Sequence, residues 1–279
     1  MMSAEYRQWI GRRETHEDVV TRAGVARFKA ALDYDAATDG VPNGFHWCLG
    51  LPQHPTQALG EDGHPPLGGF MPPVDLPRRM WAASEMSFLA PLRCDKPVTR
   101  HSCIKAITPK SGKSGDMVFV EVTHETDCDG VAAVMETQTI VYRQASGAVT
   151  PLPPVAAPPD LSDWPWQACV TPTAQLLFRY SALTFNTHRI HYDGAYATGQ
   201  EGYPALVVHG PLTASLLLKL CATHLPSQAL AGFSYRAKAP LFVDQPLYLA
   251  GRQTGTHIVL CAFGADGRIA VEATAVAKD

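Results

Sequence analysis

A nine-residue pattern occurs twice in this chain and divides it into two related halves. Residues 90–98 and 239–247 both read A-P-L-x-x-D-x-P followed by Val or Leu, at a spacing of 149 residues. In each half, two runs rich in β-forming residues then flank an Asp-Gly pair, at Asp129 and Gly130 and at Asp266 and Gly267. Asp-Gly between such runs is a strong hairpin signal, so each half is predicted to end in an antiparallel meander.

A proline-rich segment joins the two halves. Residues 150–160 contain five prolines in eleven positions, a composition that favours an extended polyproline tether. We therefore predict a first repeat over residues 1–149, a linker over 150–160 and a second repeat over 161–279. The first repeat alone has a glycine-rich stretch at residues 110–115, which predicts an exposed hairpin tip.

Each half is predicted to contain a short helix, a longer central helix and then several strands. In the second half the central helix is expected from Pro211, which suits the first helical position, to about His224. Leucines surround this segment, and a helix that is apolar on nearly all sides lies inside a protein. One buried helix wrapped by an antiparallel sheet is the hot-dog arrangement, so the fold class is predicted to be α+β, a double hot dog.

The first half is degenerate at the corresponding places. Its helix candidates are residues 18–32 and, more weakly, 44–49, and a loop-rich stretch follows over 51–81. That stretch has no counterpart of the polar cluster described below for the second half. The first repeat is therefore predicted to shape a pocket, and the second repeat to carry the chemistry.

Composition excludes several classes of protein. The net charge of −3 comes with scattered basic residues, so a nucleic-acid footprint is not expected. The longest apolar run is interrupted at Lys219 and is too short to span a membrane, and the amino terminus lacks a signal-peptide core. Seven cysteines with no close pair argue against a disulfide framework or a zinc cage and predict a cytoplasmic location.

A polar cluster comes directly after an apolar run in the second half. It comprises, within eight residues, Asn186, His188, Arg189, His191, Tyr192 and Asp193. About twenty residues later His209 and Gly210 precede the predicted central helix. A polar turn beside an open helix N-terminus indicates acid/base chemistry next to a group that stabilises negative charge.

These residues resemble those of the (R)-specific enoyl-thioester hydratases and MaoC-like dehydratases. That family has a hot-dog fold and the motif D-x-N-P-[LIV]-H, with which residues 186–191 align, and His209 and Gly210 resemble its helix opening. The stretch F-R-Y-S-A-L-T-F-N-T-H-R-I-H-Y-D at residues 178–193 is typical of its two-hot-dog branch. This branch includes 3-hydroxyacyl-thioester dehydratases and the hydratases of mesaconyl-C4-CoA and itaconyl-CoA, and the resemblance covers nearly the whole chain.

The resemblance implies a hydro-lyase that adds water reversibly to a short branched or dicarboxylic enoyl-CoA. The family's catalytic Asp falls on Asn186 and its motif Asn on His188. An amide cannot take a proton at neutral pH, so we expect His191 to be the acid/base. Asn186 is expected to orient the water through its side-chain carbonyl. Gly210, with Leu212 or Thr213, is expected to offer N–H groups to the thioester oxygen.

Other roles are less determined by the sequence. His188 is expected to help in catalysis or to contact the substrate, and a metal held by His188, His191 and Asp193 is disfavoured because zinc needs three or four ligands in fixed geometry. Arg189, Asp193, Tyr192 and His209 are expected near the substrate, although an Arg189–Asp193 pair could simply hold the loop. An arginine would bind a substrate carboxylate; the candidates are Arg27, Arg78, Arg79 and Arg236.

Several alternatives remain open at this level. His191 could be a core histidine satisfied by the backbone. The chain could be a dehydratase of fatty-acid synthesis, a hot-dog thioesterase, or an acyl-CoA binding module without turnover. The resemblance implies no cofactor beyond the coenzyme A of the substrate, an acyl-CoA as the binding partner, neither nucleic acid nor membrane as partner, and possible association into homo-oligomers.

Overall fold

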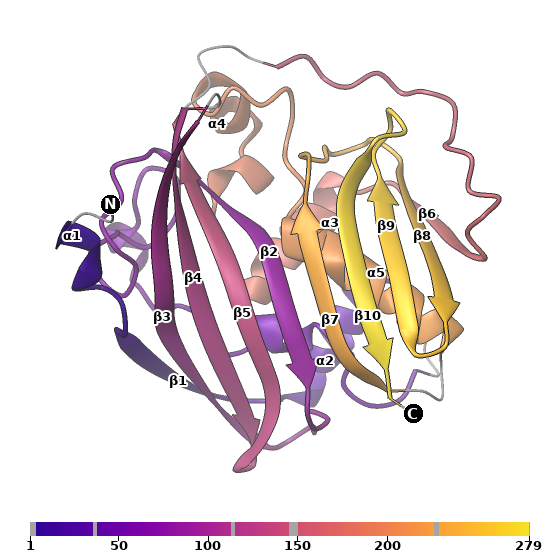
Figure 1. Cartoon of the computed structure of the whole chain (residues 1–279), viewed down its shortest axis with the longest axis horizontal. Helices are drawn as coiled ribbons and strands as arrows, with labels where there is room; N and C mark the ends of the chain where they lie inside the picture. Colours follow the sequence, from indigo (N-terminus) through magenta and orange to yellow (C-terminus); the bar gives the residue numbers. More distant parts are fainter. Residues whose placement is uncertain (1–3, 36–37, 113–114, 145–149, 226–228, 279) are drawn as a thin grey trace.

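The computed structural model describes residues 4–35, 38–112, 115–144, 150–225 and 229–278. Their strands form one ten-stranded antiparallel sheet in the order β1-β3-β4-β5-β2-β7-β10-β9-β8-β6 (Figure 1). The strands of the first repeat are β1 (Arg13–Val19), β2 (Arg78–Phe88), β3 (Pro97–Gly112), β4 (Gly115–Cys128) and β5 (Val131–Arg143). Those of the second are β6 (Trp166–Val170), β7 (Leu230–Ala237), β8 (Leu247–Thr254), β9 (His257–Phe263) and β10 (Ile269–Ala277).

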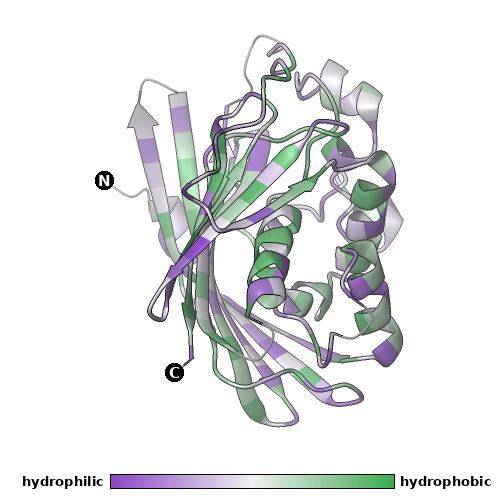
Figure 2. Cartoon of the chain, turned by 90° about the vertical axis from the view of Figure 1, so that its right-hand side faces the viewer, coloured by the Kyte–Doolittle hydropathy of each residue, from purple (hydrophilic) through white to green (hydrophobic). Residues whose placement is uncertain are grey.

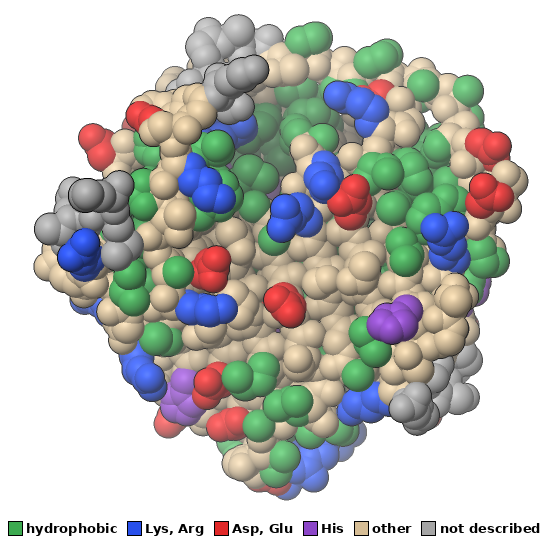
Figure 3. Space-filling view, in the orientation of Figure 1, with side chains coloured by type: hydrophobic (Ala, Val, Ile, Leu, Met, Phe, Trp, Pro, Cys, Tyr) green, Lys and Arg blue, Asp and Glu red, His purple; other side chains and the backbone are tan. Residues whose placement is uncertain are grey.

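The helices lie on one face of the curved sheet (Figure 2). The α-helices are α1 (Ala4–Arg7), α2 (Arg22–Ala31), α3 (Ala174–Thr184), α4 (Gly194–Gly199) and α5 (Gly210–His224). Three 3₁₀ turns join them, namely η1 (Phe45–Cys48), η2 (Thr56–Ala58) and η3 (Arg189–His191). The opposite face of the sheet carries charged side chains of both signs (Figure 3). Among the described residues, no helix is long and apolar enough to cross a membrane.

The two repeats have the same topology. From the centre of the sheet outward, the first reads β2-β5-β4-β3-β1 and the second β7-β10-β9-β8-β6, and β2 pairs with β7 antiparallel, for example at Ser84 and Tyr235. One apolar cluster spans both repeats and includes Phe28 and Met86 from the first and Leu217 from the second. The repeats therefore fold as one body around a shared core, and the double hot dog is the observed architecture.

The repeated motif has the same structural role in both halves. Its aspartates, Asp95 and Asp244, adopt left-handed backbone conformations with φ of 63° and 59°, which Asp tolerates better than most residues. The N–H of Asp95 donates to Val20 O and that of Asp244 to Pro172 O, at 2.7 and 2.8 Å. Each motif thus ties the start of a meander to the chain that follows the first strand of its repeat.

The short helices of the two repeats also begin alike. Thr21 caps α2 by accepting a hydrogen bond from Gly24 N, and Thr173 caps α3 by accepting one from Leu176 N. Such caps satisfy N–H groups that have no partner within the helix. The predicted helix over residues 18–32 is therefore too long at its start, because residues 18–19 belong to β1 and the Thr21 cap fixes where α2 begins.

Among the described residues, a long central helix is present in the second repeat and not in the first. α5 begins at Gly210 with Pro211 in its first turn, buries nine of its side chains, and packs against β6, β8, β9, β10 and β2. In the first repeat the weak candidate over residues 44–49 is the short turn η1, and the loop over 51–77 contains η2 as its helical element. The hairpin predicted over 110–115 joins β3 and β4, and its residues 113–114 lie outside the described residues.

The burial of α5 predicts a large cost for shortening its apolar side chains. Leu217 is fully buried, so Leu217→Ala is expected to lower the free energy of unfolding by about 2–5 kcal/mol, through lost contacts and the cavity left behind. Denaturant titration measures this change. Leu89, which is 51% exposed, is the matched control, and Leu89→Ala should stay within about 0.5 kcal/mol of the wild type.

Candidate functional site

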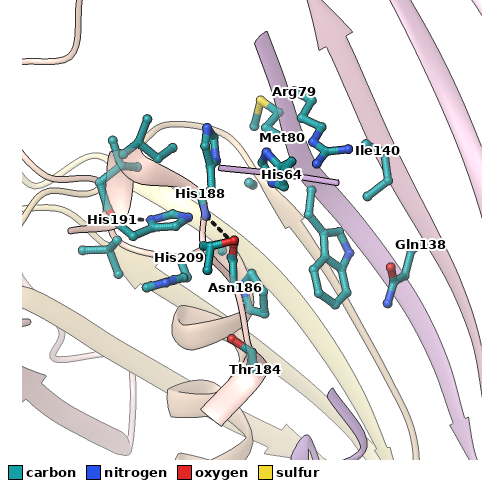
Figure 4. A pocket seen from close by; sticks show the side chains of 18 of the residues that line it. His64, Arg79, Met80, Gln138, Ile140, Thr184, Asn186, His188, His191 and His209 are labelled. Carbon is teal, nitrogen blue, oxygen red and sulfur yellow. Dashed lines mark hydrogen bonds between the residues drawn. The ribbon is translucent and has the colours of Figure 1, made fainter. Parts of the chain in front are cut away.

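A cavity of about 670 Å³ lies between the two repeats. The first repeat lines it with residues of β2, β5 and the loop over 52–71, and the second with the turn after α3 and the first turn of α5. Of the predicted site residues, those that line it are Arg79, Asn186, His188, His191, Tyr192, His209 and Gly210. Figure 4 shows most of these side chains gathered on one wall.

The turn over residues 185–193 contains the predicted catalytic residues, is called the catalytic turn below, and is shaped by local hydrogen bonds. α3 ends at Phe185, which has a left-handed φ of 47°, and Asn186 N donates to Ser181 O at 2.9 Å. The side-chain oxygen Oδ1 of Asn186 accepts the backbone N–H of His188 at 3.0 Å (Figure 4). One lone pair of this oxygen is thus engaged in the turn, and the amide NH₂ has no hydrogen-bond partner among the described residues.

His191 is held in one tautomer. Its Nδ1 lies 2.7 Å from Val207 O, and since a carbonyl can only accept, Nδ1 carries the proton and Nε2 is left with a free lone pair. The ring is buried, and burial, followed by the charge of a protonated His188, lowers the pKa of His191 to about 3. The imidazole is therefore neutral at physiological pH, with a basic nitrogen in the cavity wall.

His209 lies next to His191 at the start of α5. The two rings stack with centroids 3.6 Å apart and planes 19° from parallel. The His209 ring does not cap the helix; its Nε2 instead hydrogen-bonds Ser181 Oγ at 2.8 Å. Burial first, and then the charges of neighbouring histidines, lowers the pKa of His209 well below its ordinary value, so this ring too stays neutral.

The first turn of α5 opens into the cavity at Gly210. A side chain at this position would place its Cβ 3.3 Å from Trp81 O, so glycine allows the helix to start close to β2. Thr213 N is excluded as a donor because it bonds to His209 O at 3.2 Å. Leu212 lies beyond the cavity lining with its side chain fully buried. Gly210 N–H is thus the donor nearest the cavity, in a helix end that favours negative charge.

His188 connects the turn to a buried ion pair. Its Nε2 lies 3.6 Å from Glu201 Oε1, and Glu201 Oε2 lies 3.4 Å from Nε of the buried Arg78. The His188 ring is 5.5 Å from that of His191, in an edge-on arrangement, and 4.2 Å from that of His64. His188 is therefore both a cavity residue and a packing element between two other imidazoles.

Two of the residues expected to bind substrate instead stabilise the turn. Arg189 pairs with Asp193 at 2.7 Å and donates to Glu61 O at 3.1 Å. Asp193 also caps α4 by accepting from Tyr196 N. Neither lines the cavity, because each is engaged with the surrounding loop. Tyr192 lines the cavity, is half exposed, and donates its hydroxyl to Thr187 O at 3.1 Å.

Of the four candidate arginines, Arg79 alone lines the cavity. It extends from β2 and forms no ion pair with any described residue. Arg78 is buried against Glu201, and Arg27 and Arg236 are exposed away from the cavity. An unpaired guanidinium in a largely apolar cavity is suited to a carboxylate, which it can bind through two parallel hydrogen bonds.

The sequence reasoning missed the contribution of the loop over residues 51–77. This loop brings His64 into the cavity wall, with its Nδ1 2.8 Å from Asp62 Oδ2. Ligand atoms of Asp62, His64 and His188 lie within 4.8 Å of one another. The sequence signal was the Asp62-Gly63-His64 triplet, which has no apolar periodicity around it to indicate where it would lie.

The buried histidines predict a protein that loses stability in acid. His191 has a pKa of about 3 in the folded chain against 6.5 for an ordinary histidine, so between these values the unfolded chain binds a proton that the folded chain does not. The free energy of unfolding should therefore fall as the pH drops through this window, by up to about 1.4 kcal/mol per pH unit for this group.

Denaturant titrations at pH 7 and pH 5 measure this effect. His191→Gln should lose less stability between the two pH values than the wild type. His257→Gln, at an exposed histidine of β9, should lose as much as the wild type. Equal acid sensitivity of the His191→Gln and wild-type proteins would contradict a neutral buried imidazole.

Comparisons with solved structures agree with the fold. HtdX of Mycobacterium tuberculosis superposes with a TM-score of 0.70 at 18% identity, over 95% of this chain and 99% of that one. Another protein of that organism, described as having a double hotdog fold, superposes with a TM-score of 0.59 at 12% identity, over 96% of each chain. The predicted double hot dog is confirmed.

Comparisons of sequence identify the family. The chain is 45% identical over 278 residues to mesaconyl-C(4)-CoA hydratase of Chloroflexus aurantiacus, covering 98% of both proteins. The profile of the family described as hydroxyacyl-thioester dehydratase type 2 matches residues 44–243. These matches confirm the predicted class of enzyme, a hydro-lyase. This chain belongs to the hydroxyacyl-thioester dehydratase type 2 family.

Proposed function

We propose that the enzyme catalyses the reversible hydration of a short dicarboxylic enoyl-CoA of the mesaconyl-C4-CoA type. The observation that carries this proposal is the free Nε2 of His191, which lies in a cavity that also contains the N-terminus of a buried helix. The 45% identity to mesaconyl-C(4)-CoA hydratase over nearly the full length supports the choice of acyl group.

Hydration of an enoyl thioester needs a base, a held water and a site for negative charge. His191 Nε2 takes a proton from the water as its oxygen bonds to C3 of the acyl group, and the π electrons move toward the thioester oxygen. The Asn186 amide NH₂, whose oxygen is engaged by His188 N, orients the water. The thioester oxygen lies at Gly210 N–H, where the helix dipole stabilises the enolate.

Arg79 is proposed to bind the free carboxylate of the acyl group. Two arginines of the lining, Arg79 and Arg143, form no ion pair among the described residues. Arg143 instead donates to Tyr203 Oη at 3.4 Å, and Lys238, another cation in the lining, pairs with Glu272 at 2.8 Å. A carboxylate would offset the charge of Arg79 inside the cavity, and a simple alkyl chain would not. This contact is what would favour a dicarboxylic substrate over a monocarboxylic one.

The remaining parts of the proposal follow from the chemistry. Reversible hydration uses acid/base groups alone, so no cofactor is proposed beyond the coenzyme A of the substrate. The enzyme is proposed to work in the cytoplasm, consistent with its seven unpaired cysteines, and association of chains into homo-oligomers is part of the same proposal. Dehydration of a 3-hydroxyacyl thioester, which the family description suggests, is the same reaction in reverse.

The role of His191 is tested by removing its imidazole. His191→Ala is expected to lower kcat about 10²- to 10⁴-fold, the usual contribution of a positioned acid/base group. The assay follows the loss of enoyl absorbance with mesaconyl-C4-CoA, with thiol release measured in parallel to detect thioester hydrolysis. A folded His191→Ala protein with near-normal turnover, or a wild type that releases thiol without hydration, would refute the assignment.

The role of Arg79 is tested by a ratio of two substrates. Arg79→Met is expected to lower kcat/KM for mesaconyl-C4-CoA relative to crotonyl-CoA by about 10- to 100-fold, from the ~1.5–3 kcal/mol of a hydrogen bond to a charged group. Lys238→Met is the matched control, because loss of this already paired cation should change both substrates alike. An unchanged ratio in Arg79→Met would remove the carboxylate contact.

A further inference from the structure

The loop over residues 51–77 places a second activated imidazole in the cavity. His64 Nδ1 donates to Asp62 Oδ2 at 2.8 Å, and His64 N donates to Asp62 Oδ1 at 2.9 Å. The carboxylate thus fixes the tautomer and leaves Nε2 of His64 with its lone pair, as Val207 O does for His191. Both rings line the same cavity, with His188 between them (Figure 4).

This loop is fastened to the catalytic turn of the other repeat. Arg189 N donates to Asp62 O at 3.0 Å, and Thr187 Oγ1 donates to Gly63 O. Gly63 has a left-handed φ of 87°, and a Cβ at this position would lie 1.9 Å from Thr187 O. The backbone contact requires glycine, so the position of His64 depends on a fit that a surface loop without a role would not need.

His64 and His191 differ in the partner that holds each ring, a carboxylate for His64 and a backbone carbonyl for His191. A carboxylate beside an imidazole stabilises the protonated form of that imidazole. Among the described histidines of the cavity, His64 is the one that hydrogen-bonds to a carboxylate, that of Asp62. His191 is held by a neutral carbonyl and stacks on His209. Because the Asp62 carboxylate can stabilise an imidazolium at His64 and the Val207 carbonyl offers no negative charge to His191, the geometry suits His64 to the acid role and His191 to the base role.

We propose that the Asp62–His64 pair is a second acid/base group of this enzyme and delivers the proton to C2 of the acyl chain. The proposal rests on the hydratase function described above. His64 is the catalytic residue of the pair, and Asp62 is a positioning residue that stabilises the imidazolium. The first repeat therefore contributes a reacting group to the site as well as a wall.

The proton and electron balance of the step is complete. His191 Nε2 takes a proton from water as the oxygen–C3 bond forms and the C2–C3 π pair becomes the enolate. The enolate carbon C2 then takes the proton from Nε2 of the His64 imidazolium, which becomes neutral. One proton must return from His191 to His64, and His188 lies between them, with ring centroids 5.5 and 4.2 Å away.

Binding of a dicarboxylic substrate favours the acid form of His64. In the free protein, burial lowers the pKa of His64 to about 3, and the charge of Arg79 is the next cause. The charges that act on this ring are those of Arg79, Asp62 and His188. A substrate carboxylate on Arg79 would offset the guanidinium charge, which raises the pKa of His64 when the acyl group is in place.

The experiment compares His64→Ala and His191→Ala on the thioester that the wild type hydrates fastest. His64→Ala is expected to lower kcat about 10²- to 10⁴-fold with KM changed far less, and added imidazole should restore part of the rate. In D₂O, His191→Ala should still exchange the C2 proton of the hydrated product, and His64→Ala should not. If His64→Ala does not fold, His64→Gln serves for the rate and exchange measurements.

The loop itself is tested by a pair of glycine variants. Gly63→Ala should displace the loop from Thr187 and lower kcat about 10²-fold, the effect of a misplaced catalytic group. Gly68 has a similar φ of 90° but nothing within 4 Å of its Cβ position, so Gly68→Ala should retain the wild-type rate. Asp62→Asn should lose rate and Asp62→Glu should recover part of it.

Three results would each overturn the proposal that His64 delivers the proton. These are a His64→Ala rate within about threefold of the wild type, C2 exchange retained by His64→Ala, or stoichiometric zinc in the purified wild type bound by Asp62, His64 and His188. Failure of the hydratase function is seen separately, because the wild-type protein would then hydrate neither mesaconyl-C4-CoA nor crotonyl-CoA. A wild type that hydrates mesaconyl-C4-CoA with a fully active His64→Ala variant refutes this proposal alone.

Discussion

The antiparallel pairing of β2 with β7 is the contact on which the rest of the molecule depends. It joins two five-stranded units into one sheet and lets α5 pack on strands of both repeats. β2 also carries Arg79, Met80 and Trp81 into the cavity lining, a few residues from the start of the paired segment. The same strand therefore closes the core and builds one wall of the candidate site.

Burial of four histidines in a row sets the electrostatics of the site. The rings of His209, His191, His188 and His64 follow one another with centroid separations of 3.6, 5.5 and 4.2 Å. Burial is the largest cause of the lowered pKa of His64, His191 and His209. The partner of each ring, the Asp62 carboxylate for His64 and the Val207 carbonyl for His191, then fixes which ring nitrogen carries the proton and which keeps its lone pair.

The sequence was most informative where periodicity and repetition agreed. The repeated motif and its Asp-Gly pairs indicated both meanders, and the leucines of residues 212–220 indicated the buried helix. β1 was missed because Arg13–Val19 is a polar edge strand without an apolar face. The position of Asp62 and His64 could not be derived, because a loop without periodicity has no register and its docking depends on contacts of residues 61–63 with Thr187 and Arg189 of the other repeat.

The matching strand order of the two repeats has an evolutionary consequence. A symmetric pair of separate chains would present two identical clefts, and any new loop or lost helix would appear in both. Covalent fusion removes that constraint, since each copy can then change alone. Here the second repeat contains the long central helix, while the first has a short turn and a long loop that reaches across to its neighbour. A single cleft can therefore be lined by two unlike halves.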